Sequence, residues 1–114
     1  MGWTLNFSAD AETDFACIFD HLVESYTAFG EPLESAFQHA ENRIWQIRED
    51  ANRILTAPQR GELQNDILPG CRKLTLGSAS FWFVLHDTEQ TVQILAIFFG
   101  GQDTRRRMLL RLLE

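Results

Sequence analysis

Several features that would point directly to a class of protein are missing from these 114 residues. There are only two cysteines, Cys17 and Cys71, and neither has histidines at metal-ligand spacing, so we predict neither a disulfide framework nor a zinc site. No apolar run approaches membrane-spanning length, and residues 1–15 lack the basic and apolar regions of a secretion signal. We therefore expect a cytoplasmic protein with two reduced thiols, no metal or cofactor, and no association with a membrane.

Positive charge is also scarce, because 10 basic residues face 16 acidic ones and the formal net charge is −6. This balance argues against direct nucleic-acid binding, since affinity for phosphates comes mainly from clustered lysine and arginine. The charge is uneven, however. Residues 1–66 carry 12 acidic and 4 basic side chains, whereas residues 67–114 carry 4 acidic and 6 basic ones. An acidic partner would therefore meet the C-terminal half.

Residues 71–101 are predicted to form the centre of the fold. Residues 73–76, 80–85 and 92–99 are rich in β-prone side chains, and they are separated by Gly77-Ser78 and by a polar turn at residues 86–90. In the last segment strict alternation gives two apolar faces, with Val92, Ile94, Ala96 and Phe98 on one and Leu95, Ile97 and Phe99 on the other. Such a strand lies in a sheet covered on both sides, by its own chain or by a partner.

Helical segments precede and follow this sheet. Apolar residues recur every three or four positions from residue 9 to 30 and from 32 to 56, which predicts two amphipathic helices joined by a short turn at residues 30–32. Ser8 is the expected N-cap of the first helix, which leaves Asp14, Asp20 and Glu24 towards solvent. Residues 57–70 are predicted as a loop. Residues 104–113 are predicted as a short helix capped by Asp103 or Thr104.

With a first strand at residues 3–7, the element order is β-α-α-β-β-β with a terminal helix. This order predicts one α+β domain over residues 1–114, in which a helical hairpin packs on a small, mostly antiparallel sheet. The hairpin can cover only one face of that sheet. The apolar side of the terminal helix must cover the second face or contact another protein.

The pattern resembles the RelE/ParE superfamily of toxins from bacterial type II toxin–antitoxin systems. The resemblance spans nearly the whole chain and rests on the strand and helical hairpin, a loop with Pro58 and Gly61, the basic strand entry at residues 68–74, Gly77 with Phe81 and Phe83, and the last strand at residues 92–99. It implies a toxin held inactive in a hetero-oligomer with its cognate antitoxin. The antitoxin's C-terminal segment would wrap the toxin, and its N-terminal part would bind operator DNA.

Two branches of the superfamily differ in their target. The ribonuclease branch implies basic or tyrosine side chains on the sheet, but residues 74–85 contain no Arg, Lys or His, and Phe99 and Gln102 stand where relatives often have His and Arg. We therefore favour the ParE-like branch, which implies inhibition of a target such as DNA gyrase by binding. The alternatives are a RelE-like ribosome-dependent mRNA endonuclease and a non-toxic member that acts only as an interaction protein.

No catalytic residue is predicted, because His21, His39 and His86 have no nucleophile beside them in the sequence. Basic and aromatic residues of the C-terminal half are instead the candidates for binding the antitoxin or target. For the basic residues, a solvated surface role is the alternative, and for the aromatic ones core packing is. The candidates are Arg72, Lys73, Phe81, Phe83, Phe99, Arg105, Arg106, Arg107 and Arg111.

Overall fold

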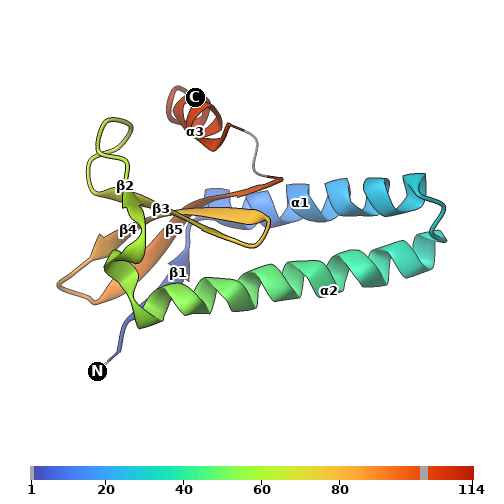
Figure 1. The fold of residues 1–114 in the computed structure, drawn as a ribbon, viewed down its shortest axis with the longest axis horizontal. Coiled ribbons are helices and arrows are strands. Elements are labelled where there is room, and N and C mark those ends of the chain that lie inside the picture. Colours follow the sequence, from blue (N-terminus) through green and yellow to red (C-terminus); the bar gives the residue numbers. More distant parts are fainter. Residues whose placement is uncertain (1, 101–102) are drawn as a thin grey trace.

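The computed structural model describes residues 2–100 and 103–114 (Figure 1). Five strands form one sheet in the order β1-β5-β4-β3-β2, in which β1 is parallel to β5 and the other neighbours are antiparallel. The elements are β1 (Thr4–Phe7), α1 (Ala9–Ala28), α2 (Leu33–Ala51), β2 (Glu62–Leu63), β3 (Cys71–Leu76), β4 (Ala79–His86), β5 (Thr91–Phe99) and α3 (Thr104–Leu112), with 3-10 turns at Asn52–Thr56 and Pro58–Arg60. This arrangement confirms the predicted α+β class.

The long helices begin where the local sequence predicts. The Ser8 hydroxyl accepts a hydrogen bond from the Ala11 backbone N–H at 3.1 Å, and Asp10 and Glu12 occupy the first turn of α1, where the helix dipole favours negative charge. Gly30 has a φ of +97°, a conformation that glycine adopts without strain, and it turns the chain towards α2. The two helices therefore lie antiparallel as a hairpin, which projects beyond the sheet (Figure 1).

The second helix is shorter than predicted. It ends at Ala51, and residues 52–56 continue as a 3-10 helix that places Ile54 in the core, fully buried. Pro58 accounts for the end of this 3-10 segment at Thr56, because a residue before proline is driven away from the helical region. Ala57 accordingly has φ −154° and ψ 75°.

Strand β2 lies within the segment that the sequence predicts to be a loop. Its two residues pair with β3 through Glu62↔Lys73 and Leu63↔Arg72. The Arg72 side chain supports this pairing from β3. Its guanidinium donates to the carbonyl oxygens of Gln59 at 2.8 Å and Gly61 at 2.9 Å, just before β2. A two-residue strand has no periodicity of its own, so only this tertiary contact reveals it.

A bulge in β5 changes which residues face each side of the sheet. Trp82 pairs with Ala96 and Phe83 pairs with Ile94, so Leu95 is the extra residue. The predicted alternation is therefore wrong beyond Ile94. Ile97 and Phe99 pack on the same side as Val92 and Ile94, whereas Ala96 and Phe98 lie on the opposite side.

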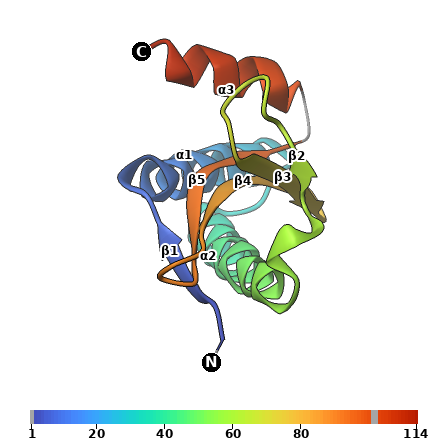
Figure 2. The same cartoon turned by 90° about the vertical axis from the view of Figure 1, so that its left-hand side faces the viewer.

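The sheet consequently has two cores of unequal size. The larger core packs β3, β4 and β5 against the hairpin, and Phe81, Phe83, Val92 and Ile94 are its fully buried strand side chains. The smaller core lies on the other face, where Met108 of α3 meets the strand residues Cys71, Trp82, Ala96 and Phe98. Figure 2 shows α3 across the sheet from α2.

Candidate partner-binding face

The second face of the sheet, which we define by Cys71, Lys73, Trp82, Ala96 and Phe98, is covered by two short segments. Strands β3, β4 and β5 present these side chains, and the Trp82 ring is fully buried. Ile67 and Leu68 from the loop before β3 cover one part, and α3 covers another through Met108. The apolar side chains of this face are thus buried within the chain, and α3 leaves large apolar side chains exposed beside it, which suits that helix to contact with a partner.

Arginines hold α3 in place at both ends. Near its start, Arg105 donates hydrogen bonds to the side chains of Gln64 and Asp66 and so joins α3 to the loop. The Arg105 guanidinium also lowers the pKa of the Asp66 carboxyl. Both partners of this ion pair are largely exposed, so it contributes little to stability.

The contact at the other end of α3 is more buried. Arg111 donates to Oδ2 of Asp14 at 2.8 Å and also to Oδ1, and its guanidinium lies over the Phe98 ring at 5.2 Å. Hydrogen bonding to the Asp14 carboxylate raises the pKa of Arg111. Asp14 Oδ2 also accepts the backbone N–H of Ile97 at 2.9 Å. This carboxylate therefore links α1, β5 and α3.

The sequence predicts that Asp14 faces solvent. This prediction is wrong, because the exposed fraction of Asp14 is only 7%. Asp14 lies on the same stripe of α1 as Ala11 and Ile18, at helical steps of three and four. A carboxylate on an apolar stripe indicates a buried acidic side chain, and this feature of the sequence pointed to its burial. Strand β1 pairs with β5 only as far as Ile94. Beyond that point, in the described part of the chain, the backbone N–H of Ile97 has no strand partner on this edge of β5, so it needs a side-chain acceptor. Asp14 supplies that acceptor.

The predicted binding residues do not form one cluster. Phe81 and Phe83 are both fully buried under the hairpin, so they are core residues rather than surface residues. Arg72 points to the β2 loop, where its guanidinium is engaged by two carbonyls. Lys73 lies on the second face, with its ammonium 5.9 Å from the centre of the Trp82 ring. The neighbours Arg72 and Lys73 thus serve opposite faces of the sheet.

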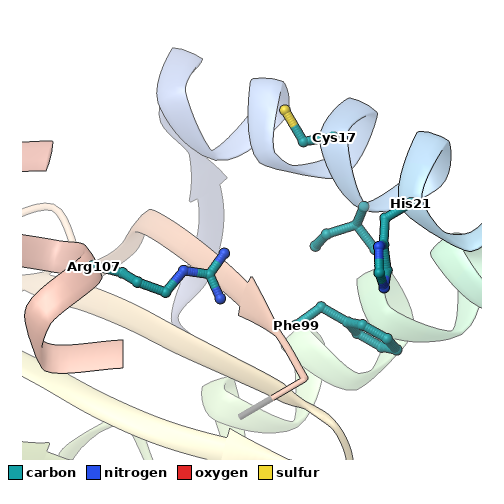
Figure 3. A pocket seen from close by; sticks show the side chains of 5 residues that line it. Cys17, His21, Phe99 and Arg107 are labelled. Carbon is teal, nitrogen blue, oxygen red and sulfur yellow. The ribbon is translucent and has the colours of Figure 1, made fainter. Parts of the chain in front are cut away.

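The remaining predicted residues gather around α3 and the end of β5. Arg107 lies over the Phe98 ring at 4.5 Å and, together with Phe99, Cys17, Ile18 and His21, lines a pocket of about 320 Å³ between α1 and α3 (Figure 3). Arg106 is exposed on the outer side of α3, and its backbone N–H donates to the Asp103 side chain, which caps the helix. Gln102, which stands where relatives often have Arg, and Gly101, the last residue of the predicted sheet region, lie outside the described residues.

The histidines are dispersed. His21 lines the pocket in Figure 3, His39 stacks on Tyr26 with ring centroids 3.7 Å apart, and His86 bonds to Gln93 at 2.9 Å. Over residues 2–100 and 103–114, no group of three metal-ligating side chains is placed to hold an ion. None of the helices in this part of the chain is long and apolar enough to cross a bilayer.

Both cysteines are free thiols, as predicted, and they should differ in reactivity. Cys17 is exposed, whereas Cys71 is fully buried and desolvation raises its pKa to about 11. We expect Ellman's reagent to modify one thiol per native chain quickly and the second only in denaturant, because the thiolate is the reactive form. Cys17→Ser should abolish the fast phase. Two fast thiols in the native wild-type chain would contradict the burial of Cys71.

Comparison with known proteins gives a consistent fold. No protein-family model and no curated protein matches the sequence. Among solved structures, the chromosomal ParDE toxin–antitoxin system from P. aeruginosa matches with a TM-score of 0.64 and 23% identity, covering 87% of this chain and 97% of that one. The RelBE2 toxin–antitoxin complex from Mycobacterium tuberculosis matches with a TM-score of 0.62 and 18% identity, covering 87% and 92%.

A third structure, a mutant of the E. coli toxin RelE in the free state, matches over 100% of both chains with a TM-score of 0.54 and 13% identity. These neighbours come from toxin–antitoxin systems of both the ParE and the RelE type. At such identities the likeness concerns the course of the backbone. The protein therefore has the RelE/ParE fold, as the resemblance in its sequence predicts.

Proposed function

We propose that this protein is the toxin component of a type II toxin–antitoxin module. The main support is the fold, whose solved neighbours come from ParDE and RelBE systems. A second support is the exposed apolar surface of α3, the helix that covers the second face of the sheet. Met108 is the α3 side chain that is fully buried there, while Leu109, Leu110, Leu112 and Leu113 remain 43–82% exposed.

The proposed antitoxin-binding surface consists of α3, the adjoining edge of the second face, and Phe99 from the hairpin side, which lines the pocket beside Arg107. It includes Lys73, Phe99, Arg105, Arg106, Arg107 and Arg111 from the predicted set, and it leaves out Phe81, Phe83 and Arg72 because of their positions. Exposed leucines beside arginines fit a partner segment that carries apolar and acidic side chains. A cognate antitoxin with an extended C-terminal segment would supply both, and its own N-terminal part would bind DNA.

The proposed action on the target is binding rather than RNA cleavage, with DNA gyrase as the target. Cleavage of RNA needs groups that move protons and stabilise charge on phosphate. On the second face, the described strands present one cation, Lys73. Of the α3 arginines, Arg105 and Arg111 are engaged in ion pairs and Arg107 stacks on the Phe98 ring. Residues 74–85 add no basic side chain.

The decisive experiment expresses the protein with and without the product of the neighbouring gene. We expect growth arrest when the protein is expressed alone, rescue and a co-purifying complex when both are present, and inhibition of DNA supercoiling by purified gyrase. Absence of both growth arrest and complex would refute the proposal. Cleavage of ribosome-bound transcripts would replace the gyrase target with the endonuclease alternative. A complex without growth arrest would indicate the non-toxic interaction protein.

The binding surface is tested by replacing Arg105, Arg106 and Arg107 together with alanine. We expect weaker antitoxin binding with the fold retained, because the Arg105 ion pair is exposed and contributes little to stability. Arg53→Ala with Arg60→Ala, two exposed arginines in the 3-10 turns, serves as the control. If the triple variant and the wild type bind the antitoxin with equal affinity, these three arginines have only a solvated surface role.

A further inference from the structure

A second apolar surface lies on the helical hairpin, away from both faces discussed above. Between α1 and α2 runs a groove of about 420 Å³ whose apolar lining includes Ala16, Phe19, Ile44 and Trp45. Its polar lining is Glu12, Glu41 and Arg48, and Arg48 forms an ion pair with Glu12 at 2.7 Å. Trp45 is 64% exposed although it is a large aromatic side chain. We call this surface the hairpin groove.

The apolar character continues along α2 towards the tip of the hairpin. Phe37 stacks on Phe19 across the seam with ring centroids 5.8 Å apart, and it is still 46% exposed. Leu33, one turn further, is 58% exposed. Leu33, Phe37 and Trp45 are spaced by four and eight residues, so they share one side of α2. A continuous exposed stripe of this kind is the usual mark of a docking site for a helix.

Charge restricts what can occupy the groove. Residues 9–51, which form the hairpin, contain 10 acidic and 2 basic side chains, and their net charge is −8. A matching helix must therefore be apolar on one side and basic overall.

The chain itself contains a helix with these properties. Helix α3 carries four arginines and no acidic residue, and Arg106, Leu110 and Leu113 follow one another at steps of four and three on its outer side. Leu110 is 52% exposed and Leu113 is 82% exposed. Nine residues of α-helix span roughly 13 Å, which approximates the eight-residue distance from Phe37 to Trp45 along α2.

This helix cannot reach the groove of its own chain in the observed fold. Met108 and the Arg111–Asp14 ion pair hold α3 on the second face, across the sheet from α2 (Figure 2). In the free chain its outer stripe remains available to a second copy, which would compete there with the antitoxin proposed above. We propose that two copies of the chain associate by placing the Arg106, Leu110 and Leu113 stripe of one copy in the hairpin groove of the other.

The test measures the mass of the full-length protein in solution by light scattering after size-exclusion chromatography, over a range of concentrations. We expect a dimer that dissociates on dilution and at high salt, because Arg106 of the stripe faces an acidic hairpin. A groove variant, Phe37→Ser with Trp45→Ser, and a helix variant, Leu110→Ser with Leu113→Ser, should each be monomeric. Leu63→Ser, which changes a 48% exposed leucine on β2, should leave the dimer unchanged.

Mixing the two variants makes the test specific. Each variant retains the surface that the other has lost, so a one-to-one mixture should recover an intact groove–helix contact and the mass of a dimer. Circular dichroism melting of each variant would verify that it folds. A monomeric wild type, a helix variant that still dimerises, or a mixture of folded variants that stays monomeric would each overturn the proposal.

Discussion

Replacing Trp82 by alanine is expected to lower the free energy of unfolding by about 3–5 kcal/mol. The ring is fully buried in the smaller core, between Cys71 and Ala96 of the neighbouring strands and Met108 of α3. Removing it leaves a cavity in a layer with few other large side chains, and the remaining atoms cannot close it. Denaturant unfolding followed by circular dichroism would measure the change.

Two further variants separate this packing effect from other effects of losing a tryptophan. Trp82→Phe should cost about 1 kcal/mol, since it keeps most of the volume and removes an indole N–H that has no hydrogen-bond partner among the described residues. Trp45→Ala, at a site exposed in the single chain, should cost less than about 0.5 kcal/mol when both proteins are measured as monomers at high dilution and high salt. A fall of only about one or two degrees in the melting temperature of Trp82→Ala would show that the ring is not buried in solution.

Replacing Asp14 by alanine is expected to cost about 3 kcal/mol or more, because it leaves the Arg111 guanidinium without its buried partner. The same change removes the acceptor for the Ile97 backbone N–H at the edge of β5, so α1, β5 and α3 lose a common anchor. Chemical denaturation measures the loss of stability. Hydrogen exchange should show faster opening of α3 and of the Ile97 amide.

The exposed Asp20 on the same helix offers a matched control, and Asp20→Ala should change stability by less than about 0.5 kcal/mol. If Asp14 acts through Arg111, the double variant Asp14→Ala with Arg111→Ala should be less destabilised than the sum of the single variants. Strict additivity of the two changes would mean that the ion pair makes no net contribution.

The sequence predicts the secondary-structure elements better than it predicts which side chains lie on the candidate face. The helix N-caps at Ser8 and Asp103, the turn at Gly30 and the strands around residues 71–99 follow local rules that act within a few residues, so they are readable in the sequence. The sequence does not predict which of the individual binding candidates lie on the surface. Phe81 and Phe83 are as apolar as a docking surface would be, and only the packing of the hairpin over them makes them core residues.

By itself, the sequence determined the order of the three helices and the four longer strands, the two-sided apolar sheet and the absence of basic residues from residues 74–85, because composition and periodicity are local properties. The tertiary structure alone decided the Leu95 bulge, the strand at Glu62–Leu63, the burial of Asp14 and the engagement of each arginine. Each of these depends on a contact between groups far apart in the chain, such as Asp14 and Arg111, and the pattern of neighbouring residues does not predict such a contact.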